Sequence, residues 1–169
     1  LYTLARYTTV GKVALVEKYD RLGSVNSSAI NNSQTLHVGE IETNYTMEKV
    51  RQVKPAAMMV KCYVDGLPIE AHTQHIRTVQ KMVLAVGAKE VAELELRFPA
   101  LQEIFPELQK LDAAAIAQTE PELMRGRDTS EPVLALYNPK GYAVNFGLLA
   151  ESLGREAQKY NDRVDMLMS

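Results

Sequence analysis

Several features that would narrow the class of protein are missing from the 169 residues. The chain contains no tryptophan and only one cysteine, Cys62, so it cannot form an intramolecular disulfide. Because stable disulfides belong to oxidising compartments, we expect a cytoplasmic or other reducing location. The chain begins with Leu1 rather than Met, which indicates processing or truncation before that residue.

Neither a long apolar run nor an excess of charge is present. Charged residues interrupt every stretch that approaches the roughly 18 consecutive apolar residues that a membrane span requires. The 19 Lys and Arg residues nearly balance the 21 Asp and Glu residues, which gives a formal net charge of -2. We therefore expect no membrane span, and nucleic-acid binding would require a local basic patch.

The short motifs that mark common active sites are also missing. The sequence contains no Gly-x-Gly-x-x-Gly, no P-loop, no Gly-x-Ser-x-Gly, no paired cysteines and no His-Glu-x-x-His. These patterns carry nucleotide binding, acyl transfer and metal binding. We accordingly assign no catalytic residue, no cofactor and no metal ligand from sequence.

What is present is the composition of a globular protein. An apolar fraction of 46% and a charged fraction of 24% are average for such proteins. A chain of this length is able to bury one proper core, so we predict a single globular domain over 1–169. Between about 21 and 35 the composition shifts to Gly, Ser and Asn, which predicts a polar surface loop.

Apolar residues at helical spacing predict most of the secondary structure. They indicate a helix over 69–86 with Gly87 just past its end, and a second helix from Val91 to Pro99. The most regular stripe predicts an amphipathic C-terminal helix of nearly six turns. Its members are Phe146, Leu149, Leu153, Ala157, Tyr160, Val164 and Leu167.

Other segments favour short helices or strands. The first twenty residues lean towards a helix, the prolines at 99 and 106 break the middle into short helices, and Thr119 has capping-box spacing. Alternating apolar residues predict a strand over 58–64, and an Asn-Pro-Lys-Gly turn at 138–141 predicts a hairpin between 133–137 and 142–146. The fold class is α+β, helix-dominated: a helical cluster with a small antiparallel sheet or β-hairpin and a long amphipathic C-terminal helix.

Two histidines and the cysteine are the residues that an enzyme would most plainly use. His72 and His75 are three residues apart on the expected helix and would need at least one further ligand to hold a metal ion. Cys62 falls on the apolar face of the expected strand, where a free cysteine behaves as a small hydrophobe. We interpret all three as structural residues.

The C-terminal helix offers two candidate surfaces. Its apolar stripe favours packing on the domain but also suits a partner helix, with Leu149, Leu153, Tyr160, Val164 and Leu167 as interaction residues. Arg155, Lys159 and Arg163 form a basic ridge beside it that suits phosphates. Acidic residues share that helix surface, which favours a solvated, ion-paired face over a nucleic-acid site.

Three functions remain open. The leading hypothesis is a non-enzymatic interaction or assembly protein that binds itself or other proteins, such as a viral coat or scaffold subunit. The second is a nucleoprotein-like module that uses the basic ridge. The third is a small enzyme whose site is assembled from distant segments, with His72, His75 and Cys62 as candidates.

Overall fold

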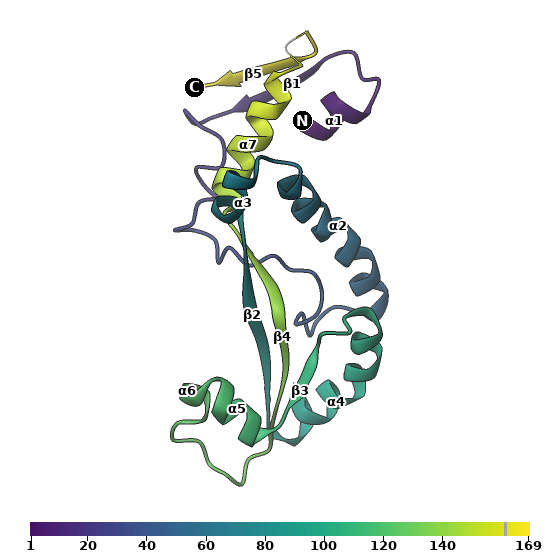
Figure 1. Cartoon of the computed structure of the whole chain (residues 1–169), viewed down its shortest axis with the longest axis vertical. Coiled ribbons are helices and arrows are strands. Elements are labelled where there is room, and N and C mark those ends of the chain that lie inside the picture. Colours follow the sequence, from purple (N-terminus) through teal and green to yellow (C-terminus); the bar gives the residue numbers. More distant parts are fainter. Residues whose placement is uncertain (161) are drawn as a thin grey trace. The chain divides into compact units, whose positions relative to one another are not determined.

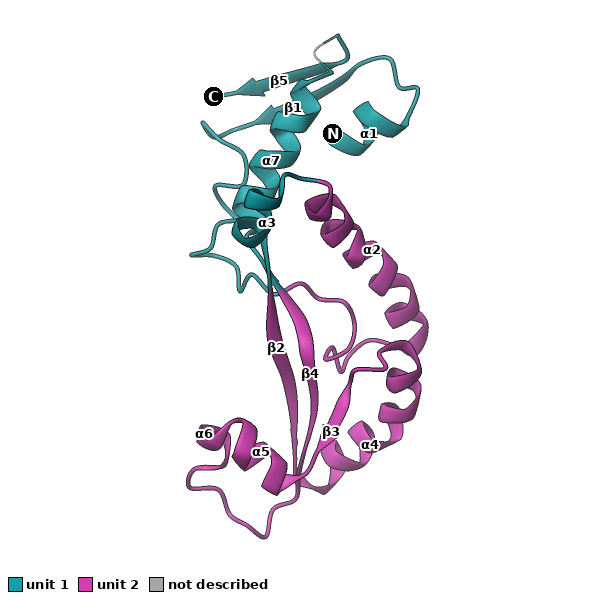
Figure 2. Ribbon diagram, in the orientation of Figure 1, with its two compact units in different colours: residues 1–35, 67–77, 143–169 teal, residues 36–66, 78–142 magenta. Residues whose placement is uncertain are grey.

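The computed structural model describes residues 1–160 and 162–169, and the chain divides into two compact units (Figure 2). Unit 1 comprises residues 1–35, 67–77 and 143–169, and unit 2 comprises residues 36–66 and 78–142. Helix accounts for 44% and strand for 22% of the structure. The coarse prediction of a mixed, helix-rich α+β fold is therefore confirmed.

Unit 1 is built around a pair of parallel strands. Its elements are α1 (Tyr2–Tyr7), β1 (Val13–Glu17), α3 (Ile69–His75), α7 (Phe146–Gln158) and β5 (Val164–Met168), labelled in Figure 1. The strands pair in parallel from Val13 opposite Val164 to Glu17 opposite Met168. Ala5, Ala157 and Val164 form a small buried core between α1, α7 and β5.

Unit 2 holds a sheet with strand order β2-β4-β3, together with four helices. The strands are β2 (Ile76–Val86), β3 (Gln109–Leu111) and β4 (Val133–Val144), and the ends of β2 and β4 at 76–77 and 143–144 belong to unit 1. The helices are α2 (Met47–Asp65), α4 (Gly87–Ile104), α5 (Ala113–Thr119) and α6 (Pro121–Met124). Central strand β4 buries residues 134–136 completely or almost so, because it has a neighbour on each side.

Residues 58–64 are helical, so the strand predicted there is wrong. Helix α2 starts at the N-cap Thr46, whose side chain accepts a hydrogen bond from the Lys49 amide at 3.2 Å, and it continues through Pro55. Its two fully buried residues, Val50 and Val64, are fourteen positions apart, close to four turns, and so share one face. Alternation failed as a signal because apolar residues also fill the intervening positions.

The helix predicted over 69–86 is right only as far as His75. From Ile76 the chain is the extended strand β2, and Gly87, with φ +82°, begins α4 instead of following a helix. The stripe of Ile76, Val79, Val83 and Val86 consists of β-branched residues, which fit a pleated sheet well. Helix α4 likewise runs through Pro99, where the sequence predicted an end.

Two turn or cap predictions are also wrong. Residues 138–141 continue strand β4 and make no hairpin turn; the Asn138 side chain instead accepts a hydrogen bond from the Lys140 amide at 2.8 Å. Thr119 does not cap α6, because its hydroxyl donates to the Ala115 carbonyl within α5. The first twenty residues form a helix only at 2–7 and then strand β1.

The long C-terminal helix ends early. Helix α7 stops at Gln158, and residues 164–168 form β5 beside β1. The guanidinium of Arg163 donates to the carbonyl oxygens of Ala5, Thr8 and Val10, which fixes the start of β5 on the N-terminal segment. The apolar stripe continued past residue 158 because β5 is apolar too.

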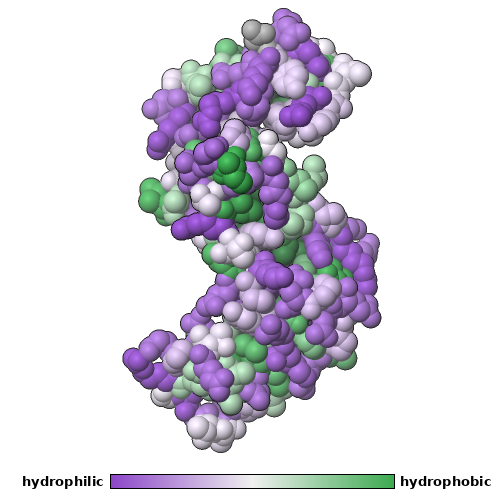
Figure 3. All heavy atoms as spheres, viewed as in Figure 1, coloured by the Kyte–Doolittle hydropathy of each residue, from purple (hydrophilic) through white to green (hydrophobic). Residues whose placement is uncertain are grey.

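The surface agrees with this core. On the face shown in Figure 3, hydrophilic residues cover most of each unit, and hydrophobic residues form smaller groups. Within residues 1–160 and 162–169, no helix combines the length and the apolar character needed to cross a bilayer.

Candidate active site

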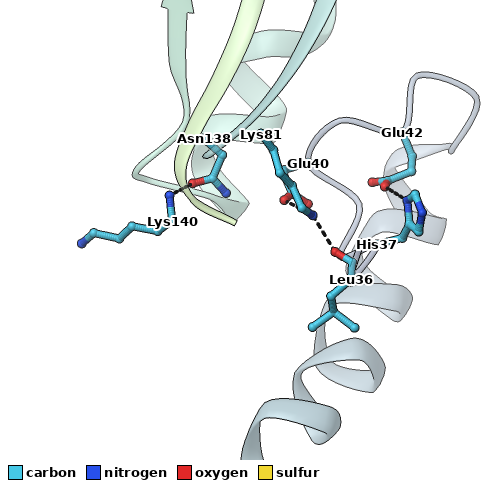
Figure 4. Close-up of polar contacts among 7 residues, drawn as sticks. All are labelled: Leu36, His37, Glu40, Glu42, Lys81, Asn138 and Lys140. Atoms are coloured by element: carbon cyan, nitrogen blue, oxygen red, sulfur yellow. Dashed lines mark hydrogen bonds and ion pairs between the residues drawn. The ribbon is translucent and has the colours of Figure 1, made fainter. Parts of the chain in front are cut away.

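The loop before α2 carries the most distinctive polar cluster of unit 2 (Figure 4). His37 and Glu42 leave this loop five residues apart, and the His37 Nδ1 and Glu42 Oε1 atoms lie 2.5 Å apart. The His37 side chain is 55% exposed, whereas that of Glu42 is only 9% exposed. The pair is therefore a histidine anchored by a largely buried carboxylate and open to solvent on its other side.

This arrangement assigns the protons on the imidazole. An ionised carboxylate only accepts hydrogen bonds, so Nδ1 of His37 carries the proton shared with Glu42. In the neutral ring the second nitrogen, Nε2, then holds a lone pair that is able to take a proton. A histidine oriented by a carboxylate in this way is the usual general base of enzymes that remove a hydroxyl proton.

A buried ion pair fixes the same loop from below. The Lys81 ammonium, on β2, donates to Glu40 Oε1 at 2.8 Å and to the Leu36 carbonyl oxygen at 2.5 Å. The two side chains are 4% and 0% exposed. The second oxygen, Glu40 Oε2, is buried without a hydrogen-bond partner among the described residues. Both ends of the segment 36–40 are thus held by one lysine, which positions His37 between them.

Glycine at two positions makes this cluster possible. A Cβ atom on Gly141 would lie 2.5 Å from Cγ of Lys81, so the lysine stem crosses β4 directly over that glycine. Gly39 has φ +107°, a conformation that side chains resist, and a Cβ there would approach Val50 Cγ1 to 3.1 Å. Gly141 is conformationally ordinary, and the space for Lys81 is its contribution.

The interaction residues expected on a terminal helix are distributed over two elements. Leu149 and Leu153 lie on α7, and Leu149 is 7% exposed. Tyr160 lies beyond the helix, while Val164 and Leu167 lie on β5. Val164 is part of the unit 1 core, and Leu167 is exposed. The structure therefore does not gather these five residues on one helical face.

The basic residues are occupied individually. Arg155 lies 3.9 Å from Glu151, Lys159 lies 2.7 Å from Glu156, and Arg163 binds backbone carbonyl groups. With the helix ended at Gln158, they form no continuous ridge on it.

The three residues named for an enzyme lie apart from the dyad. His72 shares a hydrogen bond with the Leu67 carbonyl, His75 is buried at the end of α3, and Cys62 is exposed on α2 rather than buried in a strand. Among the residues that the structure describes, no group of three or more His, Cys, Asp or Glu side chains is gathered as a metal ion would require.

Sequence reasoning missed His37, Glu42, Glu40 and Lys81. One local signal was available, a histidine and two glutamates within six residues directly after the polar loop. Lys81 gave no signal, because a lone lysine within an apolar segment usually reaches solvent.

Comparison with solved structures places the fold among flavoenzymes and related oxidases. Glycine oxidase from Geobacillus kaustophilus aligns with 99% of this chain and 42% of its own, with a TM-score of 0.66 and 20% identity. L-proline dehydrogenase from P. horikoshii aligns with a TM-score of 0.64 and 19% identity, over 99% of this chain and 39% of its own. At these identities the likeness establishes the fold alone.

Sequence comparison identifies the family. The malate:quinone oxidoreductase family matches residues 3–168, and the chain belongs to that family. A probable malate:quinone oxidoreductase of Campylobacter jejuni is 40% identical over 167 residues, which cover 95% of this chain and 37% of that protein. The malate:quinone oxidoreductase of Helicobacter pylori strain 26695 is 37% identical over 94% of this chain and 36% of its own length. The chain thus spans little more than a third of these relatives.

Family membership overturns the leading functional hypothesis. A non-enzymatic interaction or assembly protein, such as a coat or scaffold subunit, is wrong, because the family is one of oxidoreductases. The inclination against an enzyme and the nucleic-acid module are corrected by the same finding. Chemistry left no standard motif here because histidine and carboxylate pairing depends on the loop geometry.

Proposed function

We propose that this chain is a segment of a malate:quinone oxidoreductase and supplies the base that takes the hydroxyl proton of malate. The His37–Glu42 dyad carries this proposal, and the family supplies the substrate. Oxidation of malate at its hydroxyl carbon breaks the O–H and C–H bonds and forms a carbonyl group. The proton from oxygen passes to Nε2 of His37, and the hydrogen on carbon leaves with its electron pair as a hydride.

The buried carboxylate of Glu42 has two roles in this step. It holds Nδ1–H, so that Nε2 is the atom that faces the hydroxyl group, and its negative charge stabilises the imidazolium that forms. The Lys81–Glu40 pair acts at one remove, because it fixes both ends of the segment that carries His37. Lys81 and Glu40 are accordingly positioning residues.

A redox cofactor fits part of unit 1. An L-alpha-glycerophosphate oxidase from Mycoplasma pneumoniae with FAD bound has a similar fold, with a TM-score of 0.58 and 19% identity. The half-buried Glu17 ends the parallel strand β1, the position from which dinucleotide-binding folds hold a ribose hydroxyl. The glycine-rich turn of such folds is not among these 169 residues. Glu17 would hold the ribose, and FAD when bound would supply the two-electron acceptor.

The test uses the full-length protein that contains this chain. Malate-dependent reduction of a soluble quinone analogue is measured for the wild type, His37→Gln and Glu42→Gln. We expect His37→Gln to lower kcat by roughly a hundredfold to ten-thousandfold, with little change in KM, because the base acts in the chemical step. Glu42→Gln should lower kcat by a smaller factor, since the imidazole remains.

His72→Gln is the matched control, because His72 is a histidine of unit 1 whose ring bonds only to the Leu67 carbonyl in the contacts described above. It should retain wild-type kcat. Full activity of His37→Gln would refute the role of the dyad, and absence of malate-dependent reduction in the wild-type protein would refute the proposed function itself.

A further inference from the structure

A separate cavity of about 240 Å³ lies within unit 1. Its walls come from the polar loop, from the junction of α3 with β2, and from the junction of β4 with α7. Four of its lining residues carry the polar chemistry: Gln34, His75, Arg77 and Asn145. The proposed step at His37 uses none of them.

His75 is an unsatisfied group in the wall of this cavity. The residue is 4% exposed, and its Nδ1 lies 2.8 Å from the Ala71 carbonyl oxygen. A carbonyl only accepts, so Nδ1 carries the proton, and Nε2 of the neutral ring holds a lone pair. Nε2 is buried and has no hydrogen-bond partner in the part of the chain that the structure describes. Buried acceptors are normally paired, so this one matches a hydroxyl donor on a ligand.

The remaining lining favours a negative charge. The exposed Arg77 offers a guanidinium, and no acidic residue occurs among the lining residues described. Asn145 is the N-cap of the thirteen-residue helix α7, which places the positive end of that helix dipole at the same cavity. A carboxylate is the small anionic group that an arginine fork and a helix N-terminus both bind well.

The wall is held in an unfavourable backbone conformation. Gln34, with φ +61°, is the one non-glycine residue with positive φ in residues 1–160 and 162–169. Its carbonyl accepts from the Val144 amide at 2.7 Å, and its side-chain oxygen accepts from the Phe146 amide at 3.0 Å. Such residues persist where the surrounding structure fixes them, and they concentrate at binding sites.

From these observations we propose that the unit 1 cavity binds a small carboxylate that bears a hydroxyl group. Arg77 and the N-terminus of α7 hold the carboxylate, and Nε2 of His75 accepts the hydroxyl hydrogen. The inference concerns binding alone and does not depend on the redox activity proposed for the dyad.

The test measures binding calorimetrically to the full-length, FAD-loaded protein with two ligands of matched shape. The first is 2-hydroxy-2-methylsuccinate, which has no hydrogen on its hydroxyl carbon and so resists oxidation there, and the second is 2-methylsuccinate, which lacks the hydroxyl group. We expect the hydroxylated ligand to bind about tenfold more tightly, the value of one additional buried hydrogen bond. Arg77→Gln should weaken both ligands at least about tenfold, whereas Lys89→Gln, an exposed cation outside the cavity, should weaken neither.

His75→Phe should bring the ratio of the two affinities close to one. Because a core substitution could disturb folding, Arg77→Gln and the wild-type ratio test the site independently of that variant. Equal affinity of the two ligands for the wild type would overturn the proposal. So would a ratio that collapses in His37→Gln and persists in His75→Phe, which would assign binding to the dyad and leave the proposed function intact. Binding that appears only after FAD is removed would assign the cavity to the cofactor and also overturn it.

Discussion

Two charged pairs leave the same loop of unit 2, and they lie in opposite environments. Lys81 and Glu40 are 4% and 0% exposed, whereas His37 is 55% exposed above its partner Glu42. A buried pair cannot exchange protons readily with a substrate, but it resists displacement because either charge alone would be strongly destabilising. The difference in burial therefore separates a pair that holds the loop from a pair that reacts.

The largest expected effect tests the buried pair. Lys81→Met leaves the Glu40 carboxylate buried without its cation, and we expect a loss of about 3–5 kcal/mol in the free energy of unfolding. Chemical denaturation of the full-length protein measures it. Lys81→Met combined with Glu40→Leu should recover a substantial part of the loss, since no unpaired charge remains. A single variant as stable as the wild type would show that the pair does not hold the loop.

A smaller effect is expected opposite the lysine stem. Gly141→Ala places a Cβ atom 2.5 Å from Cγ of Lys81, so the stem or β4 must move. We expect a loss of about 1–3 kcal/mol, typical of overpacking. Gly11→Ala is the control, because nothing lies within 4 Å of a Cβ atom there. Similar melting temperatures for the two variants would contradict the close crossing of Lys81 and β4.

An exposed pair on α2 extends the comparison to the smallest effect. The hydrogen bond from Lys61 to Asp65, at 2.6 Å, raises the pKa of Lys61 above its usual value, and both side chains are largely accessible. Because the folded-state pKa is raised, this contribution to stability is complete below the unfolded pKa and is lost as pH rises through the folded one. Asp65→Asn should therefore lower the pKa of Lys61 and reduce stability by only about 0.3–0.5 kcal/mol at neutral pH. An NMR titration of the Lys61 side chain measures the first change, and an unshifted titration would contradict it.

Local patterns predicted some elements and failed at others for identifiable reasons. The start of α7 was predictable, because its stripe begins at Phe146 and Asn145 caps it by accepting from the Leu148 amide at 3.0 Å. The end of α7 was not, because β5 continues the apolar spacing and its partner β1 lies about 150 residues earlier. The dyad left a faint signal in sequence, whereas nothing local indicated that Lys81 would be buried.

The sequence alone determined the mixed, helix-rich class, the helical stripes at 69–75 and 146–158, and the apolar content of the cores. Only the tertiary structure decided that 76–86, 133–144 and 164–168 are strands, and that one lysine of β2 meets the loop at 36–40. The reason lies in the range of the bonds. A helix closes its hydrogen bonds four residues away, so its own residues specify it, whereas a strand or a buried ion pair acquires its partner only when distant segments fold together.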